Sequence, residues 1–444
     1  MLTRPGVPPL ALAQLSSRDD FARLLRNAWL LAAVALLFIG MALQRPVPAA
    51  VGALVLLAGM AAMAWSRLSL ERIGYERRWT GQRAFVGDEI EATFTLRNRK
   101  ALPLPWFEVR ELVPDQLPPA AAHILPAAWQ GAFYYIHTTS LAWYERVTWR
   151  QRFACMARGY YKFGPARLRS GDIFGFFPRE ATLARVDIIS VLPRLVDLGD
   201  VELPTRRPFG EARGGSPIFE DQSRIAGLRD YRPGDPLKRI DWKATARRGT
   251  LQSRLYDPSS TVTLMLVLSV DTFLHPWEGY DPLLLERAVS VCGSIASLAE
   301  SKRYAVGLLA NCSYPGADRP IAVPAGRDPA QLTRVLEALA MVMPFTILTT
   351  ENLLELERKR FPIGVSVAII AGFMTQPLAE YLERMQHEGE SLALYWVGDE
   401  APSVPLRNVT VYDLSHRLRD FERSDELAYG GESASGNRLV RRAI

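Results

Sequence analysis

The sequence predicts a multidomain protein that combines a two-helix transmembrane hairpin, an immunoglobulin-like β-sandwich and a doubly wound α/β domain. Two uncharged apolar runs lie near the N-terminus, short alternating runs follow them, and buried strands then alternate with helices towards the C-terminus. With 444 residues, 48% of them hydrophobic, the chain can bury about two or three separate cores.

The predicted hairpin consists of the apolar runs 28–43 and 47–65, which only Gln44, Arg45 and Pro46 separate. Each run approaches the roughly 20 residues that cross a bilayer, although the first must borrow Leu24 and Leu25 or thin the membrane. The outer flanks carry the arginines Arg18, Arg23, Arg26, Arg67, Arg72, Arg77 and Arg78. The positive-inside rule therefore predicts a multi-pass inner (cytoplasmic) membrane protein whose segment 1–27 and soluble domains face the cytoplasm. A pair of buried core helices is the alternative.

Strand patterns dominate from residue 75 to residue 185. Residues 90–97 alternate between apolar and polar, 85–89 supplies a turn before them, and 147–153 is a further β-rich run. Prolines and glycines separate such runs, which is typical of an antiparallel immunoglobulin-like sandwich. We expect Trp143, Tyr144 and Trp149 to pack in its core or across strands, with a ligand platform as the alternative.

The region 261–414 alternates strands with helices. The expected strands are 262–268, 304–310, 364–371 and 391–397, and the expected helices are 282–299, 329–341, 351–360 and 377–388. This order predicts a parallel, doubly wound sheet with ligands beyond the strand C-termini. Residues 415–444 are polar and charged and are expected to form a disordered tail.

Chemistry-bearing motifs are sparse. Cys155, Cys292 and Cys312 are odd in number and widely spaced, so neither a disulfide framework nor a zinc knuckle is indicated. The sequence holds no phosphate-binding loop, nucleophile elbow, zinc-protease motif or dinucleotide fingerprint, and its five histidines are scattered. We therefore predict no catalytic residue and no cofactor.

The segment 186–260 contains a dense cluster of positive charge. Between residues 224 and 254 nine Lys and Arg face three Asp, a net charge of +6 that equals the charge of the whole chain. Its turn at 233–236 predicts a helix with Asp235 as N-cap, Pro236 at the first position and Gly249 as the stop.

On such a helix Arg239, Lys243 and Arg247 would line one face, while Ile240 and Trp242 would supply apolar surface for docking. These charges either bind a partner or pair internally with neighbouring aspartates, and the two roles are compatible. Nucleic-acid binding is a third interpretation, which no recognised motif supports.

The same segment resembles the signature of the bacterial "domain of unknown function 58" family, an Arg-x-Tyr-x-x-Gly-Asp turn followed by Ile-Asp-Trp-Lys-x-x-Ala-Arg. The matching residues are Arg229, Tyr231, Gly234, Asp235, Ile240, Asp241, Trp242, Lys243, Ala246 and Arg247. Residues 158–165 and 170–177 are similar to the family's lead-in to this core. We expect a protein-binding site made of Arg229, Tyr231, Gly234, Asp235, Arg239, Asp241, Trp242, Lys243 and Arg247.

The resemblance also implies that the α/β domain is a degenerate von Willebrand factor type A-like domain. Such domains bind Mg²⁺ through an Asp-x-Ser-x-Ser loop after the first strand. Here the loop begins at Asp271, but Phe273 and His275 occupy the serine positions, and no carboxylate follows the strand that ends at Ala371. We expect no metal, unless a neighbour such as Thr272 completes the site.

By resemblance, the function is that of a membrane-anchored cytoplasmic scaffold or adaptor. Its implied partner is a MoxR-type AAA+ ATPase, and the pair would act in the assembly or activation of envelope complexes, with homo-oligomers also possible. A membrane-associated hydrolase that depends on Asp271 or Asp235 is the alternative. Nucleic-acid binding is the second alternative, and no nucleic-acid partner is expected.

Overall fold

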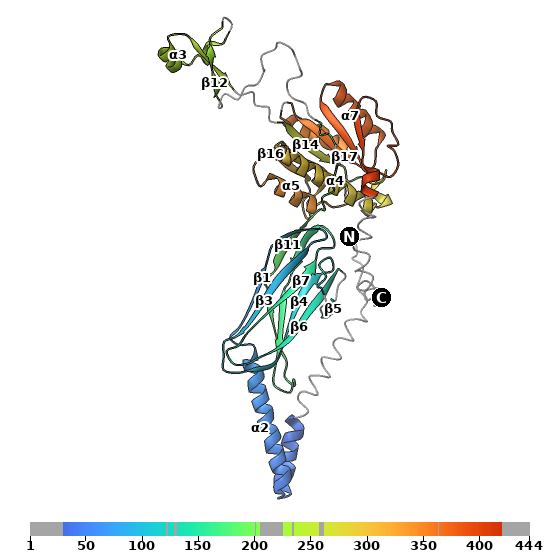
Figure 1. Ribbon diagram of the computed structural model, residues 1–444. Helices are drawn as coiled ribbons and strands as arrows, with labels where there is room; N and C mark the ends of the chain where they lie inside the picture. Colours follow the sequence, from blue (N-terminus) through green and yellow to red (C-terminus); the bar gives the residue numbers. More distant parts are fainter. Residues whose placement is uncertain are drawn as a thin grey trace, which may run out of the picture. The chain divides into compact units, whose positions relative to one another are not determined.

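The computed structural model describes residues 30–120, 123–127, 131–199, 201–204, 225–232, 235–256, 262–362 and 364–419 (Figure 1). It divides into two compact units, Met1–Val191 and Leu192–Ile444, and each is considered by itself. The expected N-terminal segment 1–27 and most of the expected C-terminal tail lie outside the described residues.

The first unit begins with two apolar helices, Leu30–Ala42 and α2 (Pro46–Ser69). They approach each other at small residues: a Cβ on Gly40 would lie 2.3 Å from the Ala49 nitrogen, and one on Gly52 would lie 2.7 Å from the Leu37 nitrogen. Close contact at small residues is typical of helices that pack in a membrane. α2 has a mean hydropathy of 2.1 with 11% of its apolar window buried, so it is long and apolar enough to cross a bilayer.

Antiparallel strands form the rest of this unit. One sheet has the order β1-β3-β7, a second β10-β9-β4-β6-β5 and a third β2-β11-β8. Their bounds are β1 (Ile73–Trp79), β2 (Arg83–Phe85), β3 (Glu89–Asn98), β4 (Leu104–Pro114), β5 (His123–Pro126), β6 (Ala132–Leu141), β7 (Arg146–Ala154), β8 (Gly159–Phe163), β9 (Ala166–Ser170), β10 (Arg179–Leu183) and β11 (Asp187–Leu192). The expected strands 90–97 and 147–153 are β3 and β7, and Gly87 takes a positive φ of 95° in the turn before β3.

Aromatic side chains from several strands fill the core of the β sheets. Phe94 stacks on Trp149 at 5.3 Å between ring centroids, and Phe153 meets Phe163 edge-on at 5.1 Å. Trp149 thus packs in the core as expected. Trp143 and Tyr144 do not: they are 66% and 70% exposed, because they lie in the turn between β6 and β7 rather than on a strand.

A charged network is buried beside this aromatic core. The guanidinium of Arg77, 2% exposed, donates to Glu111 at 2.6 Å and to Asp187 at 2.7 Å. Tyr75 also donates to Glu111, Trp79 donates to Asp187, and the Arg77 guanidinium lies 4.7 Å from the centre of the Phe163 ring. Arg185 also donates to Asp187, at 3.1 Å, so two arginines and neutral donors hold the two buried carboxylates.

The second unit contains a six-stranded sheet of order β16-β15-β14-β17-β18-β19. Every pairing is parallel except that of β15 with the edge strand β16. The elements are β14 (Thr263–Leu268), α4 (Pro282–Ser301), β15 (Ala305–Ser313), β16 (Pro320–Gly326), α5 (Gln331–Ala340), α6 (Thr350–Glu357), β17 (Ser366–Ala371), α7 (Gln376–His387), β18 (Ser391–Trp396) and β19 (Thr410–Asp413). Short 3-10 turns, η2 (Pro276–Glu278) and η3 (Arg358–Arg360), complete this list.

All four expected strands and all four expected helices of this domain form, whereas β16 and β19 have no counterpart in the sequence-based prediction. β16 alternates buried and exposed residues at the sheet edge, and all but one residue of β19 are exposed, so neither shows a buried apolar run. α4 is also apolar enough to span a membrane, but 61% of its apolar window is buried against the sheet. Residues 415–419 of the expected tail form a helical turn, in which Ser415 and Leu418 are each 2% exposed.

Candidate functional site

The family-signature segment forms a small module around an antiparallel hairpin. β12 (Ile225–Asp230) pairs with β13 (Gln252–Tyr256), and the chain between them forms the 3-10 turn η1 (Leu237–Arg239) and α3 (Trp242–Arg248). Tyr231 extends the ladder through its N–H, which donates to the Leu251 carbonyl at 2.8 Å. Gly234 lies outside the described residues.

The helix of this module begins later than the sequence predicts. Its N-cap is Asp241, whose carboxylate accepts from the N–H groups of Lys243 and Ala244 at 3.0 Å, and not Asp235. Pro236 precedes η1, and Ile240 returns the backbone to an extended conformation between η1 and α3. Only the predicted stop is right, since Gly249 ends α3 with a φ of 72°.

The prediction that Arg239, Lys243 and Arg247 line one continuous helix face is therefore wrong. Arg239 lies in η1, so only Lys243 and Arg247 of the three share a helix. The spacing of the basic residues suggested a single helix that starts at Asp235. Asp241 is a better N-cap than Asp235 because its carboxylate reaches two free N–H groups.

Aspartates neutralise part of the positive charge, as the internal-pairing interpretation expects. Arg229 donates to Asp235 at 2.7 Å, and Arg254 donates to Asp241 at 3.0 Å. The backbone N–H of Arg232, together with the side chains of Arg229 and Arg239, lowers the pKa of Asp235. The N–H of Ala244 and the Arg254 guanidinium lower the pKa of Asp241. Both carboxylates thus remain charged and brace the two ends of the module.

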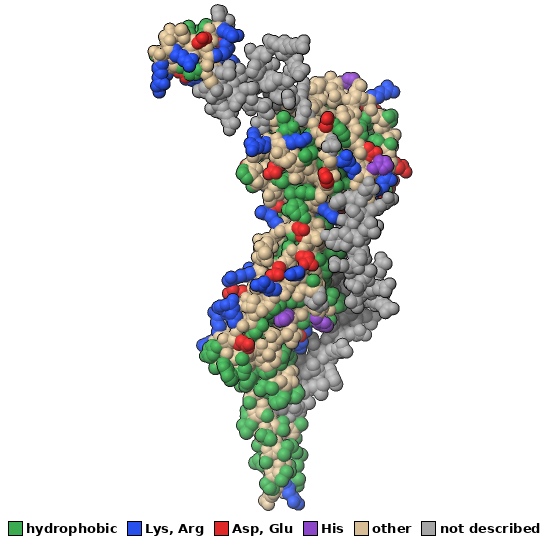
Figure 2. All heavy atoms as spheres, viewed as in Figure 1, with side chains coloured by type: hydrophobic (Ala, Val, Ile, Leu, Met, Phe, Trp, Pro, Cys, Tyr) green, Lys and Arg blue, Asp and Glu red, His purple; other side chains and the backbone are tan. Residues whose placement is uncertain are grey.

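Other residues of the module are exposed. Lys243 and Arg247 are exposed on α3, Trp242 is 67% exposed at its first turn, and Leu237 is 73% exposed on η1. Of the two residues expected to dock the helix, Ile240 is buried at 5% exposure and Trp242 is not. Figure 2 shows Lys and Arg side chains spread over the visible face of the module. It therefore combines large apolar side chains with cations on its surface.

A second candidate site lies where β14 ends, at the point where the strand order reverses. A cavity of about 330 Å³ opens there, lined by 269–275, by the segment 344–351 before and within α6, and by residues that follow β17. In doubly wound sheets this crevice at the carboxyl ends of the strands is the usual ligand position.

Asp271 lies at the bottom of this cavity and accepts several hydrogen bonds. Asn311 donates its amide at 2.7 Å, Thr346 its hydroxyl at 2.6 Å and Ser269 its hydroxyl at 3.1 Å. Thr272 does not join them, because its hydroxyl accepts the N–H of Asp281 at 3.0 Å. The carboxylate is thus held by neutral donors from three segments of the chain.

The residues that replace the metal-loop serines line the same cavity as Asp271. Phe273 is 43% exposed, and His275 stacks on Trp277 with 4.2 Å between ring centroids. In the part of the chain that the structure describes, no group of three or more His, Cys, Asp or Glu side chains could hold a metal ion. Hydroxyl and amide groups, rather than further carboxylates, surround this aspartate.

Large apolar side chains surround the mouth of the same cavity. We call this set the aromatic rim, and its members are Phe273, Leu274, Trp277, Tyr280 and Phe345, whose exposures range from 43% to 79%. Except for Trp277, each also lines the cavity. Sequence reasoning read this loop only as a failed metal site, although an uninterrupted Phe-Leu-His-Pro-Trp stretch after a buried strand is a signal for exposed aromatics.

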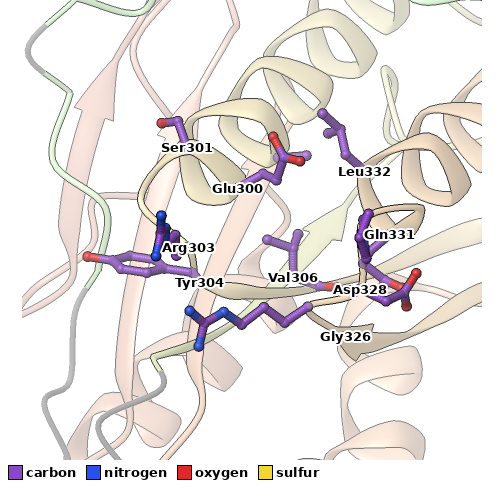
Figure 3. Close-up of a pocket in the computed structure, with 12 residues that line it drawn as sticks. Glu300, Ser301, Arg303, Tyr304, Val306, Gly326, Asp328, Gln331 and Leu332 are labelled. Carbon is purple, nitrogen blue, oxygen red and sulfur yellow. Dashed lines mark hydrogen bonds between the residues drawn. The ribbon is translucent and has the colours of Figure 1, made fainter.

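A further pocket, of about 450 Å³, lies at the opposite edge of the sheet, between the end of α4 and the start of α5 (Figure 3). Arg303 and Tyr304 lie on one side of it and Asp328 and Gln331 on the other (Figure 3). The Gln331 amide is used structurally, since it donates to the carbonyls of Val306 and Pro324. Because this edge carries the amino ends of the parallel strands, we favour the Asp271 cavity as the candidate site.

The cysteines are poor candidates for chemistry. All three are buried and free. Burial raises the pKa of the Cys155 thiol to about 11 and raises that of Cys292 further. A buried thiol with a raised pKa is a weak nucleophile.

Comparisons with known proteins find similarities for parts of the chain. A curated relative, the uncharacterized protein YeaD of Bacillus subtilis (strain 168), is 27% identical over 217 residues, which are 47% of this chain. The chain covers 48% of that relative. Similar solved structures include the CARDB domain of a Pyrococcus furiosus protein (14% identity, 27% of this chain, 87% of that chain, TM-score 0.18) and a cohesin module from Clostridium perfringens (8%, 27%, 96%, 0.19). The model of one family, described as "Protein of unknown function DUF58", matches residues 227–417. Residues 227–417 are therefore similar to this family, and the uncharacterized relative agrees with that match.

Proposed function

We propose that the chain is a membrane-anchored cytoplasmic scaffold or adaptor that binds protein partners through its second unit. The observation that carries the proposal is the exposure of Trp242 and Leu237 in the same short stretch as Lys243 and Arg247. Tryptophan and arginine are enriched in the few residues that dominate binding energy at protein interfaces. The family-signature residues that brace the module, Arg229 and Asp241 among them, would hold this surface in shape.

The aromatic rim is the second proposed docking surface. Contiguous exposed apolar patches are uncommon on monomeric proteins and mark interaction sites. Strand order β16-β15-β14-β17-β18-β19 with an antiparallel β16 supports a von Willebrand factor type A-like domain, in which the rim occupies the usual ligand edge. The antiparallel sheets of the first unit likewise support an immunoglobulin-like sandwich.

Membrane anchoring rests on the helix pair of the first unit. Side chains such as Val47, Leu54 and Leu57 are more than 60% exposed, which in water would be unfavourable for an uncharged helix. The turn carries Arg45 alone, while Arg67 lies at the far end of α2. The proposed placement is the inner membrane, with both ends of the hairpin and the two folded units in the cytoplasm.

The proposed partner is a MoxR-type AAA+ ATPase, and the proposed process is assembly or activation of envelope complexes, as the family resemblance implies. Self-association is a further proposal. The test is a pull-down from crosslinked membranes, in which Lys243→Glu with Arg247→Glu, and separately Trp242→Ser, should abolish capture of the partner. Arg150→Glu with Arg152→Glu makes the same charge change on exposed residues of the β sheets and should leave capture intact. Undiminished capture by the α3 variants would overturn the proposal for this surface.

A hydrolase centred on Asp271 or Asp235 is the competing proposal. Neutral donors bind the Asp271 carboxylate and Arg229 pairs with Asp235, which supports a structural role for both residues. The hydrolase proposal would be favoured if the purified protein hydrolysed a substrate and the Asp271→Asn variant lost this activity. Nucleic-acid binding is the second alternative. It would be favoured if nuclease treatment abolished capture of the partner. The pairing of Arg229 and Arg254 with aspartates counts against it.

A further inference from the structure

Exposed aromatic side chains gather on two loops of the β sheets in the first unit. One loop, between β9 and β10, carries Ile173, Phe174 and Phe176 at 55%, 68% and 66% exposure. The other, between β6 and β7, carries Trp143 and Tyr144. We call these five residues the aromatic collar. Neither partner binding nor the fold uses them.

The first loop is built to hold its phenylalanines outward. Asp172, fully buried, accepts the N–H groups of Phe174, Phe176 and Phe177 at 2.6 to 3.2 Å, and Trp106 donates to its carbonyl. Gly175 lies between the two phenylalanines with a φ of 73°, a conformation that other residues rarely adopt. A buried carboxylate that accepts hydrogen bonds from three backbone amides fixes the shape of the loop. The loop therefore holds the phenylalanine rings in exposed positions.

Both loops lie at the C-terminal end of α2. The Ser66 hydroxyl of α2 donates to the Phe177 carbonyl, and Arg179 donates to the Arg67 carbonyl at 3.2 Å. On the other side, the Lys100 ammonium donates to the carbonyls of Ser69 and Glu71 just past the helix. The Lys100 carbonyl in turn accepts the N–H of Tyr144 at 3.2 Å. Figure 2 shows apolar side chains covering α2 and continuing onto the adjoining end of the β sheets.

Cations accompany the collar at this end. The exposed arginines there are Arg67, Arg72, Arg99 and Arg179. Tryptophan and tyrosine are enriched at the membrane–water interface, where an apolar ring and a polar edge meet both phases. Arginines at the same level attract anionic headgroups. A lipid surface fits both features together, whereas the continuity with α2 leaves little room for a protein partner.

We infer that the aromatic collar inserts into the cytoplasmic interface of the bilayer and fixes the β sheets upright on the membrane at the exit of α2. This inference rests on the proposed membrane anchoring by α2. Its occupant is a phospholipid interface with anionic headgroups, and its consequence is that the β sheets do not swing freely on a linker. The distal end of the sheets stays in water.

The experiment uses the full chain in nanodiscs of mixed zwitterionic and anionic phospholipid, with an environment-sensitive fluorophore on one introduced cysteine. The native cysteines are buried, so they should not react under native conditions. Probes at Phe176→Cys and Trp143→Cys report the two loops. Met156→Cys, 61% exposed just beyond β7, is the matched control, because the nine residues of β7 place it about 25–30 Å from the collar.

We expect the two collar probes to shift to the blue and to lose fluorescence when the nanodisc carries lipids with a quencher near the headgroup. The Met156→Cys probe should show neither change. Collar probes that stay as wet and as unquenched as Met156→Cys would overturn the inference. If a cell extract abolishes the quenching of the collar probes, a protein covers the collar instead of lipid. That result would also overturn the inference.

A third probe separates this inference from the anchoring on which it rests. Leu54→Cys lies in the middle of α2, and Leu54 is 67% exposed. Quenching of this probe by lipids that carry the quencher deep in the acyl chain supports anchoring. If Leu54→Cys is quenched and the collar probes are not, the collar fails alone. If Leu54→Cys is not quenched, both proposals fail.

Discussion

Replacing Arg77 by methionine tests the buried charged network directly. The side chain of Arg77 is 2% exposed, and its guanidinium binds Glu111, fully buried, and Asp187, 8% exposed. Methionine keeps much of the volume but leaves Glu111 without a cation and Asp187 with only the exposed Arg185. Breaking a buried pair in this way costs about 3–5 kcal/mol, because a buried charge remains uncompensated. The opening equilibrium of the β sheets should rise by roughly 100- to 5,000-fold.

The three buried cysteines provide the assay. Cys155 lies in the core of the β sheets, whereas Cys292 and Cys312 lie in the α/β domain. Thiol labelling of the full chain across a denaturant series should therefore move the midpoint of Cys155 down in Arg77→Met and leave the midpoints of Cys292 and Cys312 unchanged. Arg78→Met is the matched control on the same strand: Arg78 is 81% exposed, pairs with Glu76 at 3.3 Å, and should cost less than about 1 kcal/mol.

The pH dependence of the effect has a defined sign. Burial raises the pKa of Glu111 in the native protein, although Arg77 and Tyr75 oppose it. Without Arg77 this pKa rises further, so the folded variant takes up a proton that the unfolded chain does not bind. The destabilisation by Arg77→Met should therefore shrink as the pH falls from about 8 to about 5. For Asp187 burial is again the largest influence, but hydrogen bonds from Arg77 and Trp79 outweigh it and lower the pKa, a contribution lost as the pH falls.

Two results would refute this reasoning. One is a Cys155 midpoint in Arg77→Met that equals that of Arg78→Met. The other is strict additivity of Arg77→Met and Glu111→Gln, since residues in one network must couple. Glu111→Gln retains an acceptor for Tyr75, so the double variant should be less destabilised than the sum of the two single variants.

Three further predictions follow from the second unit and from the thiols. Asp271→Ala should destabilise the α/β domain by about 2–4 kcal/mol, because the Asn311 amide and nearby hydroxyls lose their acceptor, whereas Asp271→Asn should cost less than about 1.5 kcal/mol. Equal effects on the Cys292 midpoint would contradict this hydrogen-bond assignment. Trp242→Ser should weaken partner capture at least ten-fold without moving any thiol midpoint, and a shifted midpoint would mean that the ring supports the fold. Cys155, with a pKa of about 11, should stay unmodified by iodoacetamide at about pH 8 in the native protein, and rapid modification would contradict its burial.

Periodicity predicted the elements that bury a continuous or alternating apolar face. The run 262–268 became β14 and 282–299 became α4, because strands and helices buried on most sides must be apolar at nearly every inward position. The edge strands β16 and β19 were missed because β16 alternates over only a few positions and contains two prolines, and all but one residue of β19 are exposed. The uncharged run 47–65 became part of α2, which is long and apolar enough to cross a bilayer.

Local chemistry was a weaker guide in the signature segment. Both Asp235 and Asp241 are followed by residues that allow a helix start, and sequence alone cannot weigh them. Asp241 is the N-cap of α3 because Arg254 of β13, thirteen residues away, binds the same carboxylate and holds it over the free N–H groups. Pairing of Arg229 with Asp235 likewise needs the hairpin to bring the two together.

The sequence by itself determined the apolar helix α2, most strands and helices of the α/β region, the location of the signature segment and the absence of recognised catalytic motifs, because each depends on residues that are near in the chain. Only the tertiary structure decided which side chains meet. The donors to Asp271 come from positions 269, 311 and 346, and the network around Arg77 joins residues up to 110 positions apart. It also decided that Trp143 and Trp242 face outward, since exposure depends on what the rest of the chain covers.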